Sequence, residues 1–251
     1  MPITVNRVRH EMRYRRITVT AAERITPKMA RITFASGELE GFASPGFDDH
    51  VRLFFPRPGA ALPVPEVGAR GLDWPDPAPE HRDYTPRFYD PDTLELTVDF
   101  VLHDHGVASD WAAAARPGDE IGLAGPRGSF LLEGEADWQL LIGDATALPA
   151  IARRLEELPA DSWAMAVIEV ASAAEEQPLD SRAIVATTWL HADAGEGLAD
   201  HLETLELPKG EGFVFCAAEA EVVAQARARL AALGLPESHL RAANYWRRAQ
   251  H

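Results

Sequence analysis

Cysteine is almost absent from this chain of 251 residues, which contains only Cys216. A single cysteine excludes an internal disulfide and a thiolate metal cluster within one chain. Cys216 lies in the apolar run Gly212–Ala217. We therefore predict a buried, unreactive thiol.

Long apolar segments are also lacking. No run approaches the roughly 20 apolar residues that a membrane-spanning helix needs, so we expect no stable membrane insertion. The first sixteen residues are polar and basic, without the apolar core of a signal peptide. These two absences predict a cytoplasmic protein.

Positive charge is scarce: 24 Lys and Arg face 39 Asp and Glu, which gives a formal charge of −15. This balance argues against nucleic acid and against an anionic membrane surface as partners. A site for an anion must then be built locally. His103 and His105 flank Asp104, but metal sites usually need three or four ligands, so we predict no metal site.

The first half of the chain has the pattern of short strands. Apolar and polar residues alternate at period two, which is typical of half-buried strands. The expected strands are Arg16–Thr20, Ala30–Phe34, His50–Phe55, Leu94–Val101 and Ile121–Ala124. Short strands joined by turns predict an antiparallel barrel or sandwich.

Two segments interrupt this pattern. Residues 56–79 hold seven of the 19 prolines, so this excursion is either disordered or folded over a site. Residues 109–116 predict one short helix, with Ser109 as its N-cap and Pro117-Gly118 as its end.

From about Asp137 the pattern changes to alternating apolar strands and helices. The expected strands are Trp138–Gly143, Ala164–Val170, Ile184–Leu190 and Gly212–Ala217, and the expected helices are Ala147–Leu158, Gly197–Leu205 and Glu219–Leu233. Near-continuous apolar strands that alternate with helices predict a parallel, doubly wound sheet. In a two-domain protein of this kind, a ligand usually binds between the domains.

The stretch Arg82–Arg87 (RDYTPR) combines two guanidiniums, an aromatic ring and a hydroxyl within six positions. Pro86 cannot donate to a strand ladder, so the strand should lie at an edge or bend there. A ring that can stack and cations that can bind phosphate suit a flavin nucleotide. An ordinary charged strand face is the alternative.

Six motifs in order resemble one family, the siderophore-interacting flavoproteins of the ferredoxin-reductase-like superfamily. They are Arg82–Arg87, Asp99–His103, Gly106–Ala112, Gly125–Phe130, Gly143–Ile151 and Tyr245–Arg248, within a resemblance that runs from Arg31 to Arg248. The resemblance implies an FAD-binding β-barrel domain at residues 12–132 and an NAD(P)H-binding α/β domain at residues 136–251.

The resemblance also implies roles for residues of the first domain. Tyr84 would pack on the isoalloxazine ring and Thr85 would hydrogen-bond its redox-active edge, while Arg82 and Arg87 would bind flavin polar atoms and phosphate. The pyrophosphate and adenosine would be held by His103 and the turn Ala108-Ser109, with Trp111 anchoring the helix. Asp99 and Val101, in the same motif region, complete the expected FAD site. A free helix N-terminus suits a diphosphate.

The second domain would receive the nicotinamide or the substrate. Gly143, Asp144, Thr146 and Ala147 lie at its first strand-to-helix turn, where such sheets bind ligands, although no GxGxxG motif is present. Glu219, Tyr245, Trp246, Arg247 and Arg248 complete this expected set. The terminal aromatics would either guard the flavin or pack as a last strand into the core, and the two arginines would attract an anionic ferric chelate.

Four alanines depart from the family pattern, at Ala145, Ala192, Ala218 and Ala224. Cations missing from this domain would weaken recognition of the additional phosphate of NADPH more than recognition of NADH. The departures therefore favour NADH, weak pyridine-nucleotide binding, or another donor such as a ferredoxin.

The resulting hypothesis is an FAD-dependent reductase that passes electrons from NAD(P)H or a ferredoxin to the Fe(III) of a ferric siderophore, so that Fe(II) is released. Outer-sphere electron transfer needs no catalytic acid or base, so no catalytic side chain is predicted. We expect a monomer. The alternatives are a general flavin-dependent NAD(P)H reductase and a siderophore-binding protein with a vestigial reductase domain.

Overall fold

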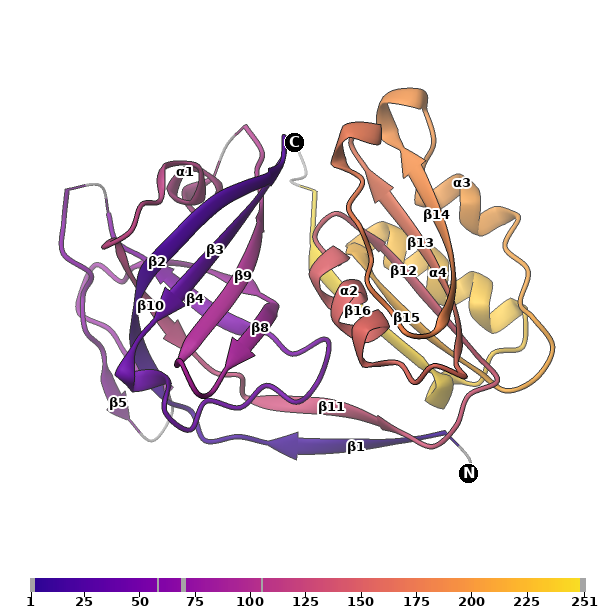
Figure 1. Ribbon diagram of the computed structural model, residues 1–251, viewed down its shortest axis with the longest axis horizontal. Helices are drawn as coiled ribbons and strands as arrows, with labels where there is room; N and C mark the ends of the chain where they lie inside the picture. The colour runs from indigo at the N-terminus through magenta and orange to yellow at the C-terminus, as the bar shows by residue number, and fades with distance from the viewer. Residues whose placement is uncertain (1–2, 58, 69–70, 105, 249–251) are drawn as a thin grey trace. The chain divides into compact units, whose positions relative to one another are not determined.

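The computed structural model describes residues 3–57, 59–68, 71–104 and 106–248. These residues divide into two compact units. One unit is Arg7–Leu131, and the other combines the first residues, up to Asn6, with the chain from Leu132 onward. Each unit has its own sheet and its own core (Figure 1).

The first unit is built on a seven-stranded antiparallel sheet with the order β7-β4-β10-β2-β3-β9-β8. Its strands are β2 (Tyr14–Thr26), β3 (Met29–Ala35), β4 (Val51–Phe55), β7 (Glu80–Tyr84), β8 (Pro86–Asp90), β9 (Glu95–Val101) and β10 (Glu120–Ala124). The outermost strands β7 and β8 are separated in sequence by Thr85 alone, so the sheet must curl until its edges meet. This confirms the predicted barrel and the predicted edge position of Pro86.

The barrel core follows from the period-two alternation. On β9 the side chains of Leu96, Val98 and Phe100 are fully buried, while Thr97 and Asp99 lie on the opposite face. Helix α1 (Val107–Ala114) packs over the interior, with contacts to β3, β4, β7 and β9. A short 3-10 turn, η1 (Gly37–Leu39), places the buried Leu39 in the same core.

The proline-rich excursion is folded where the structure describes it. It contains a two-stranded hairpin, β5 (Glu66–Gly68) and β6 (Gly71–Asp73). Trp74 follows β6 and packs against Phe54 of β4, with ring centroids 4.6 Å apart. Of the two predicted states, the described part therefore takes the folded one.

One pair of strands was not predicted. β1 (Thr4–Arg9) pairs with β11 (Gly128–Glu133) in a separate two-stranded sheet (Figure 1). β1 carries no period-two signal, because four of its six residues are polar, four are exposed and none is buried.

The second unit contains the predicted parallel sheet, in the order β14-β13-β12-β15-β16. Its elements are β12 (Trp138–Asp144), α2 (Leu148–Glu157), β13 (Trp163–Val170), η2 (Ala173–Glu175), β14 (Ile184–His191), η3 (Ala192–Ala194), α3 (Leu198–Glu203), β15 (Gly212–Glu219), α4 (Ala220–Ala232), η4 (Glu237–His239) and β16 (Leu240–Trp246). Helices α3 and α4 cover one face and α2 covers the other (Figure 1). This order confirms a doubly wound fold.

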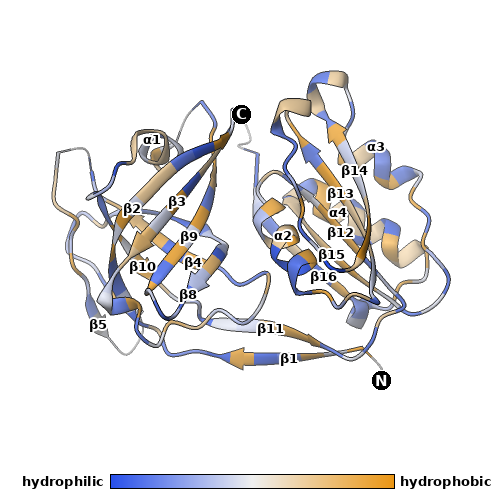
Figure 2. Cartoon of the chain, viewed as in Figure 1, coloured by the Kyte–Doolittle hydropathy of each residue, from blue (hydrophilic) through white to orange (hydrophobic). Residues whose placement is uncertain are grey.

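The central strands of this sheet, β12 and β15, are mostly apolar and almost wholly buried, because helices cover both faces. Figure 2 shows this concentration in β12 and β15, whereas the barrel strands mix hydrophilic and hydrophobic segments. Cys216 of β15 is fully buried, and burial raises the pKa of its thiol to about 12. The predicted burial of this thiol is confirmed. In the described residues, no helix is long and apolar enough to cross a membrane.

Candidate functional site

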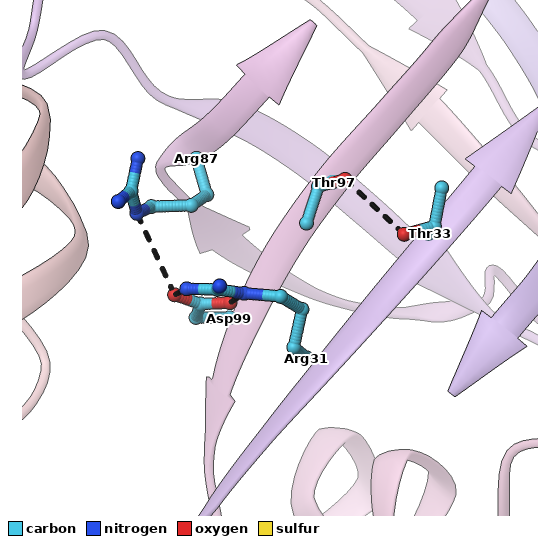
Figure 3. Close-up of polar contacts among 5 residues, drawn as sticks. All are labelled: Arg31, Thr33, Arg87, Thr97 and Asp99. Atoms are coloured by element: carbon cyan, nitrogen blue, oxygen red, sulfur yellow. Dashed lines mark hydrogen bonds and ion pairs between the residues drawn. The ribbon is translucent and has the colours of Figure 1, made fainter. Parts of the chain in front are cut away.

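A charged cluster lies on the outer face of the barrel, on β3, β8 and β9. Arg31 donates to both carboxylate oxygens of Asp99, from Nε at 2.7 Å and from Nη2 at 2.8 Å. The Nε atom of Arg87 lies 3.9 Å from Asp99 Oδ2. Figure 3 shows both guanidiniums converging on this carboxylate from neighbouring strands. Because Asp99 is only 6% exposed, its charge is compensated locally by these two arginines.

Thr33 and Thr97 extend this face along β3 and β9, with their hydroxyl oxygens 3.2 Å apart (Figure 3). The sequence prediction included Asp99 and Arg87 but missed Arg31. The signal was available: alternation on β3 places Arg31 beside Ile32 and so on the outer face, in direct register with Asp99.

The predicted flavin stretch spans the end of β7 and the start of β8. The ring of Tyr84 contacts Phe100 of the core at 4.4 Å between centroids, and burial raises the pKa of its hydroxyl. Thr85, between the two strands, is 6% exposed. Arg82 is exposed and donates to the backbone oxygen of His81 at 2.6 Å. The stretch therefore offers one anchored ring and one solvent-facing cation.

The start of α1 differs from the prediction. Ser109 is not the N-cap; that position belongs to Gly106, and Ser109 is the third residue of the helix. The Ser109 hydroxyl instead accepts from His103 N at 2.9 Å and donates to His103 O at 2.8 Å. The glycine takes the N-cap because its φ of 139° lies in a region that residues with side chains rarely adopt.

This helix start fits a phosphate-bearing cofactor. No side chain caps it, so the first backbone N–H groups of α1 point outward without a partner inside the helix. A Cβ atom on Gly106 would lie 2.9 Å from His103 Cε1, so only glycine leaves this approach open. Trp111 fixes the helix on the barrel by packing near Phe34, Phe55 and Phe100.

The remaining residues of the expected FAD set lie close to these features. Val101 ends β9 on the face that carries Asp99, and it is partly exposed. Ala108 of α1 is buried in the barrel core, so its methyl group is not available to a ligand. The cations, the uncapped helix start and the anchored ring together suit FAD as judged from the chemistry of each group.

In the second unit, β12 and β15 are neighbours whose connections leave in opposite directions. Ligands bind such sheets at this switch point, outside the carboxyl ends of the strands. Gly143 is required here, because a Cβ atom would lie 2.8 Å from the backbone oxygen of Ala217. Ala147 is fully buried beneath Gly143, so its side chain cannot reach a ligand.

Asp144 ends β12 and binds two other predicted residues, Thr146 and Trp246. Its Oδ1 atom accepts from the backbone N of Thr146 at 2.9 Å and from the Thr146 hydroxyl at 2.5 Å. Its Oδ2 atom accepts from the indole Nε1 of Trp246 at 2.6 Å. The structure therefore brings the first turn of the sheet and the last strand together.

Glu219 occupies the matching position at the end of β15. Its carboxylate accepts from the backbone N of Arg248 at 3.1 Å and from that of Glu221 at 2.6 Å, and these bonds lower its pKa. The side chains of Arg247 and Arg248 are exposed. The terminal aromatics do lie on a last strand, but Trp246 is 41% exposed, so packing of both rings into the core is wrong.

Sequence reasoning missed a pocket on the outer face of the barrel. Its volume is about 420 Å³, and its walls come from β4, β7, β10 and the excursion. Its polar lining includes His50, Arg52, His81, Asp83 and Arg127, and its apolar lining includes Phe54 and Trp74. The signal was weak, because each of these residues alone resembles an ordinary exposed strand or turn residue.

The pocket lining includes an ion pair, Arg52 and Asp83. Arg52 donates to Asp83 from Nε at 2.8 Å and from Nη2 at 3.0 Å. Burial alone would raise the pKa of the Asp83 carboxyl, but Arg52, with smaller effects of His50 and His81, lowers it. Two arginines against one carboxylate give the pocket lining a net positive charge within an acidic chain.

Two further expectations concern positions away from these sites. His105 lies outside the described residues, and among those described no group of three or more His, Cys, Asp or Glu could hold a metal. His191, which precedes Ala192, is bound by Glu176 at 2.8 Å and lies 3.7 Å from Glu196. Its imidazole ring is therefore engaged within the unit.

Two family models match the chain and together cover nearly all of it. Residues 18–130 match the siderophore-interacting FAD-binding domain, and residues 136–249 match the siderophore-interacting protein model.

Named relatives resemble the chain over most of its length. The NADPH-dependent ferric-chelate reductase of Escherichia coli is 38% identical over 96% of this chain and 95% of its own. The ferric vibriobactin reductase ViuB of Vibrio cholerae is 30% identical over 90% of this chain and 87% of its own. Among solved structures, a siderophore utilization protein from T. fusca superposes with a TM-score of 0.89 at 40% identity, covering 100% of this chain and 98% of its own.

Proposed function

Because this chain belongs to the siderophore-interacting protein family, we propose that it is an FAD-dependent reductase of ferric siderophores. One observation supports this most strongly: residues of one strand line the outer pocket, and the chain then runs directly into the expected flavin stretch. His81 and Asp83 of β7 line the outer pocket, and Tyr84 and Thr85 follow directly in the expected flavin stretch. An iron chelate in the pocket would therefore lie beside the cofactor.

Different residues of the barrel would bind different parts of FAD. Arg87, positioned by Asp99, and the uncapped start of α1 supply positive ends for the phosphates. Tyr84 supplies a ring held in place by Phe100. When bound, FAD supplies the conversion between two-electron and one-electron transfer, and the protein supplies position and electrostatics.

The outer pocket suits the anionic part of a ferric chelate. Arg52 is held at its wall by Asp83, and Arg127 comes from the turn after β10. The formal charge of the whole chain, −15, would repel an anion at long range, so this local positive balance is what makes binding favourable. Hard oxygen ligands hold Fe(III) better than Fe(II), so reduction loosens the chelate.

The second unit is the docking site for the electron donor. A pyridine nucleotide would bind at the switch point between β12 and β15, near Asp144, Thr146 and Glu219. Our proposal includes NADH as the preferred nucleotide and a ferredoxin as the alternative donor. It also includes a monomeric, cytoplasmic protein.

The direct test is donor-dependent release of Fe(II). FAD-loaded protein, an anaerobic nicotinamide donor and a ferric tris-catecholate should produce Fe(II) that a ferrous chelator traps and colours. Arg127→Gln should raise KM for this anionic substrate about tenfold and leave the reduction of a neutral quinone unchanged.

The alternatives predict other outcomes. A general flavin reductase would reduce the quinone far faster than the ferric chelate, and Arg127→Gln would not change its KM for the chelate. A siderophore-binding protein with a vestigial reductase domain would bind the chelate without producing Fe(II). Either result would overturn the proposal.

A further inference from the structure

Trp74 lies in the excursion, directly after β6, and packs against the barrel. Its ring lies 4.6 Å from that of Phe54 and 5.5 Å from that of Tyr14, nearly perpendicular to the latter at 85°. His81 adds a further ring 5.7 Å from Phe54. Four rings from three strands and the excursion thus form a continuous aromatic cluster on the outer face of the barrel.

The barrel makes room for this cluster at Gly122 on β10. A Cβ atom there would lie 2.6 Å from the Tyr14 hydroxyl oxygen and 2.7 Å from its ring, so only glycine lets Tyr14 lie across the strand. Burial raises the pKa of Tyr14 to about 12, which keeps the phenol neutral at physiological pH. Trp74 therefore rests on a fixed, uncharged support.

Trp74 is also a wall of the outer pocket. The excursion contributes Gly71, Leu72, Trp74, Ala78 and Pro79 to the lining, which also includes Arg52 of the barrel and Arg127 of the turn after β10. A dry cavity of about 150 Å³ can hold one benzene ring. The volume of about 420 Å³ therefore suits two or three aryl groups rather than a whole hexadentate chelator.

We propose that Trp74 is a specificity-determining residue that makes the pocket select iron chelators with aryl ligands, catecholates or phenolates, over chelators with aliphatic hydroxamate ligands. This inference rests on the proposed function and assigns it a substrate class. Residues 71–79 of the excursion are then the part of the barrel that carries this selectivity.

Two properties of the iron ligands, their ring and their charge, match the two kinds of residue that line the pocket, Trp74 and the arginines. A deprotonated catecholate is a flat ring with two negative charges, so three around Fe(III) leave an anionic complex. A hydroxamate carries one negative charge and no ring, so three leave a neutral complex. Aromatic rings attract one another in offset or edge-to-face contacts, and arginine binds anionic oxygens. Only the aryl complex can use both Trp74 and the cations.

The test compares two iron probes on FAD-loaded protein without donor. The probes are the Fe(III) complexes of 2,3-dihydroxybenzoate and of acetohydroxamate, with dissociation constants measured by calorimetry and KM values measured separately. Trp74→Ala should weaken binding of the dihydroxybenzoate complex about 3- to 10-fold and change the acetohydroxamate complex less than about twofold. Trp74→Phe should stay close to the parent protein.

Two further variants separate aromatic contact from simple packing. Trp74→Leu keeps an apolar side chain, so it should lose aryl selectivity while the melting temperature stays near that of the parent. Trp163→Ala removes a Trp that is 39% exposed in the other unit and should leave both constants unchanged.

The inference is overturned if Trp74→Ala and Trp74→Leu weaken both probes equally or neither. The proposed function fails differently: the parent protein then reduces neither ferric complex, whatever residue occupies position 74.

Discussion

The indole N–H of Trp246 donates to Asp144 Oδ2 at 2.6 Å, which joins the end of β16 to the end of β12. Arg248 makes a second link through its backbone N–H to Glu219 at the end of β15. The last described residues of the chain therefore bridge both strands of the switch point. A nucleotide that binds there must share this space with Trp246 or displace it.

Trp246→Phe should strengthen nucleotide binding. The change keeps a ring but removes the N–H donor, and one such hydrogen bond is worth about 0.5–1.5 kcal/mol. The dissociation constant of oxidised nicotinamide nucleotide should fall about 2- to 10-fold in a calorimetric titration. Trp163→Phe is the matched control. Weaker binding by Trp246→Phe would mean that the indole holds the nucleotide rather than competing with it.

Asp99→Asn should weaken FAD binding about tenfold. The amide cannot accept the two charged hydrogen bonds from Arg31, and it no longer attracts Arg87, so the cations lose their fixed positions. Fluorescence titration of the apoprotein with FAD measures the change. Glu95→Gln, at the other end of β9, should bind FAD like the parent. Equal affinities for Asp99→Asn and the parent would remove Asp99 from the cofactor site.

The pair Arg52 and Asp83 should stabilise the protein only above acidic pH. Because the folded protein lowers the pKa of Asp83, the contribution is present above the ordinary value of about 3.9 and is lost as the pH falls through the lower folded value. Both side chains are more than 40% exposed, which limits the effect to about 1 kcal/mol or less.

Urea unfolding of Asp83→Asn measures this dependence. The variant should be less stable than the parent at pH 7, and the difference should fade by pH 3. Arg52→Gln should lose stability in the same pH range. A difference that is the same at pH 7 and pH 3 would refute the ion-pair explanation.

Flavin reduction should be faster with NADH than with NADPH. Asp144 and Glu219 end β12 and β15, and Glu169 lies one residue before the end of the neighbouring β13. His191 is already engaged by two carboxylates. This negative edge disfavours an additional phosphate. Anaerobic stopped-flow absorbance compares the two donors directly. The E. coli relative is named for NADPH. Faster reduction by NADPH here would contradict the expected preference for NADH.

The fold was predictable because two periodicities are strong in this sequence. Alternation on β9 and β3 gave the barrel, and the apolar runs of β12 and β15 gave the parallel sheet. Ser109 was assigned wrongly as an N-cap because serine is common there, whereas the chain needed a positive φ that Gly106 supplies.

The candidate site was predictable only where a motif carries it. The stretch Arg82–Arg87 stood out by its composition, and Asp144 by its place after a strand. The outer pocket joins His50, Trp74 and Arg127, which are far apart in sequence and meet only when the excursion folds back on the barrel. Local sequence patterns do not predict contacts between residues so far apart in the chain.

The central claim is tested most directly by the absorbance of the FAD-loaded protein through one anaerobic cycle. The account predicts that NADH bleaches the flavin bands, that a ferric catecholate restores them, and that about two Fe(II) ions appear for each flavin, because a flavin stores two electrons. A colourless protein that takes up no FAD, or a reduced flavin that ferric catecholate does not reoxidise, would contradict it.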